Sequence, residues 1–108
     1  MITLFATMIV VHLLCDYPLQ GDFLARAKNH RDPIKGTPWY TALLSHAGIQ
    51  AGGVALTTHS PELAALEMVA HTIIDFGKSD GWYGFNVDQL LHIACKGMWV
   101  LMIWRGAA

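Results

Sequence analysis

The sequence predicts an all-α protein, a four-helix up-down bundle that spans a membrane, from three observations. First, 54% of the 108 residues are hydrophobic, only 14% are charged, and the mean hydropathy is +0.38, whereas soluble domains contain roughly 25% charged residues. Second, apolar segments alternate with short segments rich in glycine, proline and charge. Third, His and Asp recur four residues apart, which places both side chains on one face of a helix.

One helical membrane domain is expected over residues 1–108. Its helices are expected at residues 1–17, 38–58, 61–77 and 86–105, with an interfacial loop at residues 18–37. The first helix has no charged side chain before Asp16 and is apolar on all sides, which indicates burial on every side or contact with lipid. It lacks the basic start and the small-residue cleavage site of a signal peptide, so we expect it to be retained.

The loop at residues 18–37 is polar, and its segment 23–28 can form a short helix along the membrane surface. The second helix has no charged residue, and Trp39 and Tyr40 at its start suit an aromatic anchor at headgroup level. Three glycines give this helix small faces for close packing: Gly48, Gly52 and Gly53.

The third helix has a clear start, with Ser60 as the N-cap and Pro61 at the first helical position. Its apolar length of about 14 residues is short for an independent membrane span. The fourth helix is apolar on all sides after Lys96, which favours contact with lipid.

The third and fourth helices are expected to be antiparallel neighbours, because the glycine-rich segment 77–84 between them must be a tight connection. Residues that face each other across such a hairpin have a constant sum of residue numbers. The polar residues of the two helices satisfy this rule in three pairs: Glu67 with Lys96, His71 with His92, and Asp75 with Asp88.

The basic residues predict the orientation. Four lie in the loop at residues 18–37 and Lys78 lies in the loop between the third and fourth helices, whereas the remaining connection has none. Because basic loops stay in the cytoplasm, we expect a multi-pass protein of the inner membrane with both termini outside.

Several classes of function and site are disfavoured. A net charge of −1 without a basic stripe gives no case for nucleic acid as a partner. Cys15 and Cys95 lie in apolar helices and are interpreted as reduced core residues, with Cys95 a minor candidate ligand. His30 and His59 lie in loops and are expected to be solvated.

The candidate site combines histidines and aspartates from all four expected helices. In an up-down bundle they fall in one layer at the cytoplasmic end, and the candidate metal ligands are His12, Asp16, His46, His71, Asp75, Asp88 and His92. Unpaired polar groups are costly inside a membrane bundle, whereas a divalent cation uses imidazole nitrogen and carboxylate oxygen as ligands. Zinc is the first choice, with manganese or iron if carboxylates bridge two ions. The alternative is a set of His–Asp hydrogen bonds that fix helix register without metal.

The same residues resemble a known family, the bacterial and phage membrane proteins catalogued as domain of unknown function 3307. The family pattern reads H-x-x-x-D-F-x-L-Q, H-x-x-x-D-x-x-K and D-Q-x-x-H. The matching residues here are His12, Asp16, Leu19, Gln20, Lys28, His46, His71, Asp75, Lys78, Asp88, Gln89 and His92, with Tyr17 in place of phenylalanine. The resemblance implies a multispan helical membrane protein but provides no activity.

The leading hypothesis is a metal-dependent hydrolase, with Asp75 or Asp88 as general base and Lys78 or Lys96 available to an anionic group. The His/Asp pattern is also similar to that of membrane-embedded metal-dependent hydrolases, by analogy only. A second hypothesis is a non-enzymatic membrane protein that conducts an ion or proton or binds a host membrane partner. The third is a soluble or peripheral bundle that buries its apolar faces in a homo-oligomer instead of the lipid bilayer.

Overall fold

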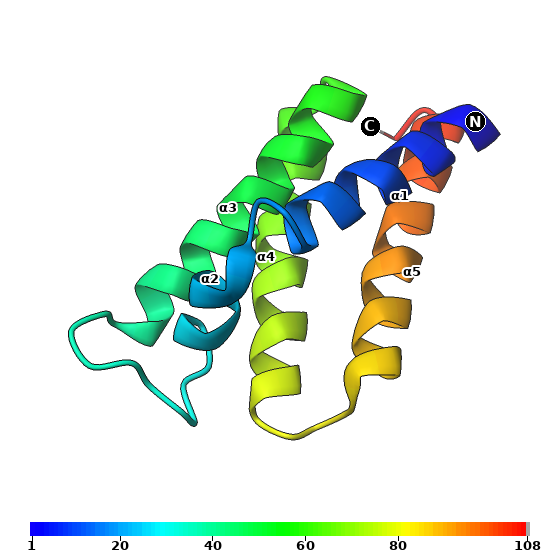
Figure 1. The fold of residues 1–108 in the computed structure, drawn as a ribbon. Helices are drawn as coiled ribbons and strands as arrows, with labels where there is room; N and C mark the ends of the chain where they lie inside the picture. Colours follow the sequence, from blue (N-terminus) through cyan, green and yellow to red (C-terminus); the bar gives the residue numbers. More distant parts are fainter. Residues whose placement is uncertain (108) are drawn as a thin grey trace.

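The computed structural model describes residues 1–107, and these residues form α helices and no strand. The prediction of an all-α protein is therefore confirmed. The five helices are α1 (Ile2–Asp16), α2 (Gly21–Ala27), α3 (Trp39–Thr58), α4 (Pro61–Ser79) and α5 (Phe85–Trp104) (Figure 1). The four long helices correspond to the four expected ones, and α2 lies in the segment expected to be an interfacial loop.

The long helices alternate in direction (Figure 1). Helix α4 runs antiparallel to both α3 and α5, and α3 and α4 share the most extensive packing. Helix α1 packs against α3 and α5, and α2 packs against α3. The two termini lie close together at one end of the molecule, whereas the α2–α3 and α4–α5 connections lie at the other.

The start of α4 follows the sequence signal. The Ser60 side chain accepts a hydrogen bond from the Leu63 N–H at 3.2 Å, and Pro61 occupies the first turn, where its missing N–H costs no helical hydrogen bond. The cap fixes where the chain turns from α3 into α4 and so sets the register of the α3–α4 pair.

One of the three glycines of α3 allows a close crossing with α1. A Cβ atom at Gly53 would lie 2.7 Å from Val11 Cγ1 and 3.5 Å from Cys15 Sγ. A Cβ atom at Gly48 or Gly52 would meet nothing within 4 Å. The prediction that all three provide small packing faces is wrong within this chain, because Gly48 and Gly52 do not face another helix.

The interior is unusually polar and the exterior unusually apolar. Of the nine largest side chains that are fully buried among the described residues, seven are polar or charged: Lys96, His12, His46, His71, His92, Gln50 and Glu67. Conversely, large apolar side chains point outward, for example Ile2 at 86% and Leu56 at 81% exposure. The small apolar core contains Met8, Val54, Leu63, Trp99 and Val100.

Taken one at a time, no helix within residues 1–107 combines the length and the hydropathy needed to cross a membrane. By length and composition alone, α1 and α2 together meet this requirement, but the pair is bent by 83°.

Candidate metal centre

The structure brings all seven sequence-predicted ligands into one cluster, in the half of the molecule away from the termini. The four histidines are at most 1% exposed, and the aspartates are largely buried, with Asp16 the most accessible side chain at 11%. Four helices contribute: α1 provides His12 and Asp16, α3 provides His46, α4 provides His71 and Asp75, and α5 provides Asp88 and His92.

The four-residue spacing brings His and Asp together within single helices. Nε2 of His12 lies 3.3 Å from Asp16 Oδ2. Nε2 of His71 lies 3.4 Å from Asp75 Oδ2, and the reversed pair on α5 has the same separation. The Nε2 atom thus points toward carboxylate in each pair, as a helix turn that stacks residues i and i+4 dictates.

Asp75 connects three helices. Its Oδ2 atom lies 3.5 Å from His46 Nε2 on α3 and 3.4 Å from His71 Nε2 on its own helix. Its Oδ1 atom lies 3.0 Å from His92 Nε2 on α5. The two oxygens therefore face different histidines.

Asp16 connects α1 to the rest of the cluster. Its Oδ1 atom lies 3.2 Å from His46 Nε2 and accepts a hydrogen bond from Gln50 Nε2 at 2.9 Å. Its Oδ2 atom accepts a hydrogen bond from Gln89 Nε2 at 3.2 Å. Two amides from α3 and α5 thus fix the orientation of this carboxylate.

Glu67 sets the orientation of the His71 ring through its Nδ1 atom. This Nδ1 atom lies 2.9 Å from Glu67 Oε2, and a carboxylate only accepts, so Nδ1–H donates; this tautomer leaves Nε2 as the nitrogen that can bind a metal ion. The Glu67 carboxylate also accepts hydrogen bonds from Lys96 Nζ at 2.8 Å and from Trp99 Nε1 at 2.9 Å. A carboxylate that fixes the tautomer of an inward-facing histidine is a typical outer partner of a metal ligand.

The predicted hairpin pairing holds at all three rungs. Glu67 and Lys96 form the buried ion pair expected from their positions. The rings of His71 and His92 stack with centroids 4.0 Å apart. At the third rung, a carboxylate oxygen of Asp75 lies within 4.8 Å of one of Asp88, and Asp75 also hydrogen-bonds to His92.

Several polar atoms of the cluster are arranged as the ligands of a cation could be. Nε2 of His71 lies 3.1 Å from Nε2 of His46, so two nitrogens that can act as ligands face each other. Asp88 Oδ1 is buried and accepts no hydrogen bond from the described residues, although His92 Nε2 lies 3.4 Å away in an ion-pair contact. A buried carboxylate oxygen without a hydrogen bond is costly, and a divalent ion would relieve that cost.

Two groups of three ligand atoms, each within 4.8 Å of one another, are suitable for an ion: Asp16, His46 and His71 in one, and Asp75, Asp88 and His92 in the other. The groups share no residue, but Asp75 of the second group contacts His46 and His71 of the first. A third group contains Glu67, whose oxygens already bind Lys96, Trp99 and His71. The first two groups therefore fit best.

Sequence reasoning did not assign Lys28 to the site. Lys28 Nζ donates to Asp75 Oδ2 at 3.0 Å and also to Gln20 Oε1. Gln20 in turn donates to the Asp16 carbonyl oxygen at 2.9 Å. Lys28 and Gln20 do occur in the motifs that carry the family resemblance, which was the available signal.

The three predicted lysine and cysteine candidates lie in different surroundings. Lys78 is exposed at the mouth of the cluster, with Nζ 5.0 Å from the centroid of the Phe85 ring. Lys96 is buried against Glu67, one helical turn from His92. Cys95 is half-buried and belongs to none of the ligand groups of residues 1–107.

The prediction that His30 is simply solvated is wrong. Its ring stacks on Phe76 with centroids 4.1 Å apart, and its Nε2 atom lies 2.8 Å from Asp80 Oδ1. Arg31 and Trp82 also donate to Asp80. The hydrogen bonds from His30, Arg31 and Trp82 lower the pKa of Asp80 from 3.8 to about 2. This contact holds the α2–α3 loop against the end of α4.

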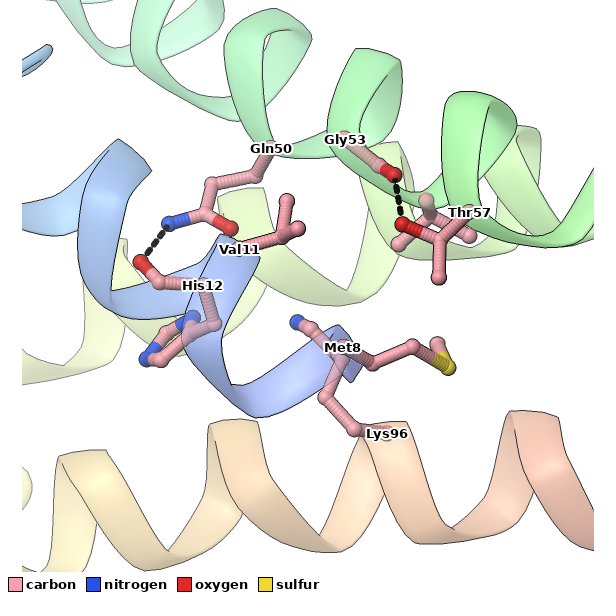
Figure 2. Close-up of a pocket in the computed structure, with 8 residues that line it drawn as sticks. Met8, Val11, His12, Gln50, Gly53, Thr57 and Lys96 are labelled. Atoms are coloured by element: carbon pink, nitrogen blue, oxygen red, sulfur yellow. Dashed lines mark hydrogen bonds between the residues drawn. The ribbon is translucent and has the colours of Figure 1, made fainter. Parts of the chain in front are cut away.

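A narrow space borders the cluster on the side toward the termini, and Figure 2 shows residues that line it. Gln50 donates to the His12 carbonyl oxygen at 3.3 Å, and Thr57 donates to the Gly53 carbonyl oxygen at 2.6 Å. The space between these residues and Lys96 leaves no room for a water molecule. Access to the cluster therefore comes from the opposite side.

Comparison with known proteins gives one result. The family model described as "Protein of unknown function (DUF3307)" matches residues 4–107. Neither a curated protein nor a solved structure matches the chain.

Proposed function

This chain belongs to the DUF3307 family of proteins of unknown function, and we propose that it is a membrane-inserted, metal-dependent hydrolase. The observation that carries the proposal is the convergence of four imidazoles and three carboxylates from four helices on one buried cluster. Such a cluster is expensive as free polar groups and favourable as a ligand set.

Zinc is the preferred ion, because neutral imidazole nitrogen and carboxylate oxygen are its usual non-sulfur ligands. Manganese or iron replaces it if both ligand groups are filled and a carboxylate joins the ions. Asp75 is best suited to a ligand role, since both of its oxygens contact imidazole nitrogens. A bound divalent ion supplies a water molecule whose pKa is lowered toward neutrality.

Asp88 is the preferred general base. Its Oδ1 atom is buried within the cluster and accepts no hydrogen bond from the described residues, so it is available for a proton of a nearby water. Lys78, exposed at the mouth, is available to a negatively charged group of the substrate.

The distribution of side chains supports insertion in the inner membrane. Apolar residues face outward and most large buried side chains are polar, the reverse of a water-soluble bundle. Helices α3 and α5 have 20 residues each, which corresponds to about 30 Å, the thickness of the hydrocarbon core. We propose that the four long helices form an up-down bundle, with the metal centre at the cytoplasmic face and both termini outside.

Hydrolysis of chromogenic 4-nitrophenyl esters of phosphate and of carboxylic acids tests the enzymatic part. We expect zinc-loaded protein to release nitrophenol, and Asp88→Asn to lower the rate by about 10²- to 10⁴-fold, the usual contribution of a general base. Asp32→Asn, an equivalent change on an exposed loop residue, should have no effect. Metal-dependent hydrolysis of neither ester class would contradict an enzymatic role.

A second candidate is a structural cluster without metal. Lys28 donates to Asp75, and Gln50 and Gln89 donate to Asp16, so protein groups already neutralise or bind two of the carboxylates. The weakest point of this alternative is Asp88 Oδ1, which lies 3.4 Å from His92 Nε2 and accepts no hydrogen bond from the described residues. Conduction of ions is disfavoured, because the closed region beyond His12 has no room for water (Figure 2).

A further inference from the structure

Two adjoining hollows open on the metal centre from its cytoplasmic side. The first has a volume of about 70 Å³ and is lined by polar residues that include Asp16, Asp88 and Gln89. The second has a volume of about 180 Å³ and includes Asn29 and Ser79. Three residues line both hollows: Lys28, Asp75 and Lys78. Any molecule that reaches Asp75 through either hollow therefore passes both ammonium groups.

The charges of this mouth suit an anion once metal is bound. Asp16, Asp75 and Asp88 contribute three negative charges to the first hollow, and Lys28 and Lys78 contribute two positive ones. One divalent ion changes the balance from one negative charge to one positive charge, and a second ion makes it more positive. The mouth should thus attract anions only in the metal-bound protein.

The two lysines differ in how they are held. Lys28 donates to Asp75 and Gln20, whereas Lys78 has no ion-pair partner within residues 1–107. Lys78 rests over the Phe85 ring, which positions its ammonium without neutralising it. Lys78 therefore brings to the entrance of the cluster a positive charge that no carboxylate of the described residues neutralises.

We propose that Lys28 and Lys78 bind a phosphoryl group, so that the substrate of this centre is a phosphate ester. The inference rests on the proposed hydrolase function and names its substrate class. A phosphoryl group is preferred over a carboxylate because its several oxygens can meet a metal ion and two ammonium groups at once, as in other phosphoryl-transfer sites.

The reaction then balances as an ordinary hydrolysis. The oxygen of water forms a bond to phosphorus, and the bond between phosphorus and the ester oxygen breaks. Asp88 accepts the proton of the attacking water and returns it to the leaving alkoxide, which departs as an alcohol. The two lysines neutralise charge on the phosphoryl oxygens throughout.

Binding of inorganic phosphate to zinc-loaded, detergent-purified protein, measured by titration calorimetry, tests this inference. The variants are Lys78→Met and the control Lys35→Met, which removes the same charge from an exposed residue outside both hollows. We expect Lys78→Met to weaken phosphate binding roughly tenfold or more, as loss of a charged hydrogen bond does. Lys35→Met should bind as the unaltered protein does. Zinc content, measured on the same samples, should be equal in all three.

A second titration uses dihexanoyl phosphatidic acid, a lipid that presents the phosphoryl group on glycerol. Tighter binding of this lipid than of inorganic phosphate, again weakened in Lys78→Met, supports the inference with a lipid headgroup as the source. Equal binding of both probes supports it with a soluble ester. Phosphate binding that is unchanged in Lys78→Met, with zinc retained, overturns the inference and leaves the metal centre intact. Absence of zinc from the unaltered protein overturns the proposed function and the inference together.

Discussion

At the residue scale, Glu67 orients His71, one of the proposed metal ligands. It orients His71 through Nδ1 and is itself held by Lys96 and Trp99. All four residues are almost completely buried, so this chain of hydrogen bonds lies in a region of low dielectric constant, where each missing partner is costly. The position of His71 therefore depends on Glu67, one helical turn away in α4, and on the two α5 residues that hold Glu67.

Replacement of Glu67 by glutamine separates these two roles. Glu67→Gln leaves the Lys96 ammonium buried without a counter-charge, and we expect it to lower the free energy of unfolding by about 3–5 kcal/mol. It also weakens the orientation of His71, so zinc affinity should fall about 10- to 100-fold. Chemical denaturation and competition with a chelator measure the two effects.

The double variant with Lys96→Met provides the control. It removes the unpaired charge and should recover most of the stability, but it should not recover zinc affinity, because the Glu67 carboxylate is still missing. If Glu67→Gln binds zinc as tightly as the unaltered protein, Glu67 has only a structural role.

At the element scale, α1 crosses α3 at Gly53. A side chain there would collide with Val11, whereas the adjacent Gly52 has open space. These two positions form a matched pair, since both lie in the same helix and both lack a side chain.

Substitution by valine should distinguish them. We expect Gly53→Val to destabilise the protein by about 1–3 kcal/mol through overpacking against α1, and to reduce zinc binding by displacing His12 and Asp16. Gly52→Val should leave both unchanged or slightly raise stability, since valine forms helix better than glycine. Thermal unfolding and zinc content check this, and equal effects of the two changes would contradict the close crossing.

The α2–α3 loop is held to α4 by Asp80, and this contact should depend on pH. Because the folded-state pKa of Asp80 is lowered to about 2 from an unfolded value of 3.8, its contribution to stability is complete above pH 3.8. It is lost as the pH falls from 3.8 through 2. The difference in unfolding free energy between the unaltered protein and Asp80→Asn should shrink over that interval. A difference that is constant with pH would show that the Asp80 charge does not contribute.

The sequence predicted the elements better than the links between them. The four-residue spacing of His and Asp and the hairpin rule were sufficient to place four of the ligands on the facing helices α4 and α5, and the Ser60 cap marked the start of α4. The Lys28–Asp75 contact was not predictable, because it depends on the 83° bend between α1 and α2. Helical periodicity predicts which residues share a face of one helix, but it does not predict the angle between that helix and the next.

At the scale of the whole molecule, the polar interior and the apolar exterior suggest a lipid environment. Outward leucine and isoleucine side chains and the concentration of basic residues at one end agree with this proposal. A homo-oligomer that covers the same apolar faces is the alternative that predicts release from membranes.

Extraction and fusion experiments test the membrane proposal. We expect the protein to remain with membranes in alkaline carbonate and to be released only by detergent. A C-terminal alkaline phosphatase fusion should be active and a C-terminal green fluorescent protein fusion dark, because both termini are proposed to be outside. Release by carbonate without detergent would contradict membrane insertion, and the opposite fusion pattern would reverse the orientation.

The metal content of the detergent-purified protein tests the central claim most directly. Elemental analysis should find a stoichiometric divalent metal in the unaltered protein and in His59→Asn, a control at an exposed, left-handed loop position that asparagine tolerates. The metal should be absent from His71→Ala and from Asp75→Ala. No metal above background in the unaltered protein, with the two cluster variants folded normally, would contradict the account and leave a hydrogen-bonded cluster that sets helix register.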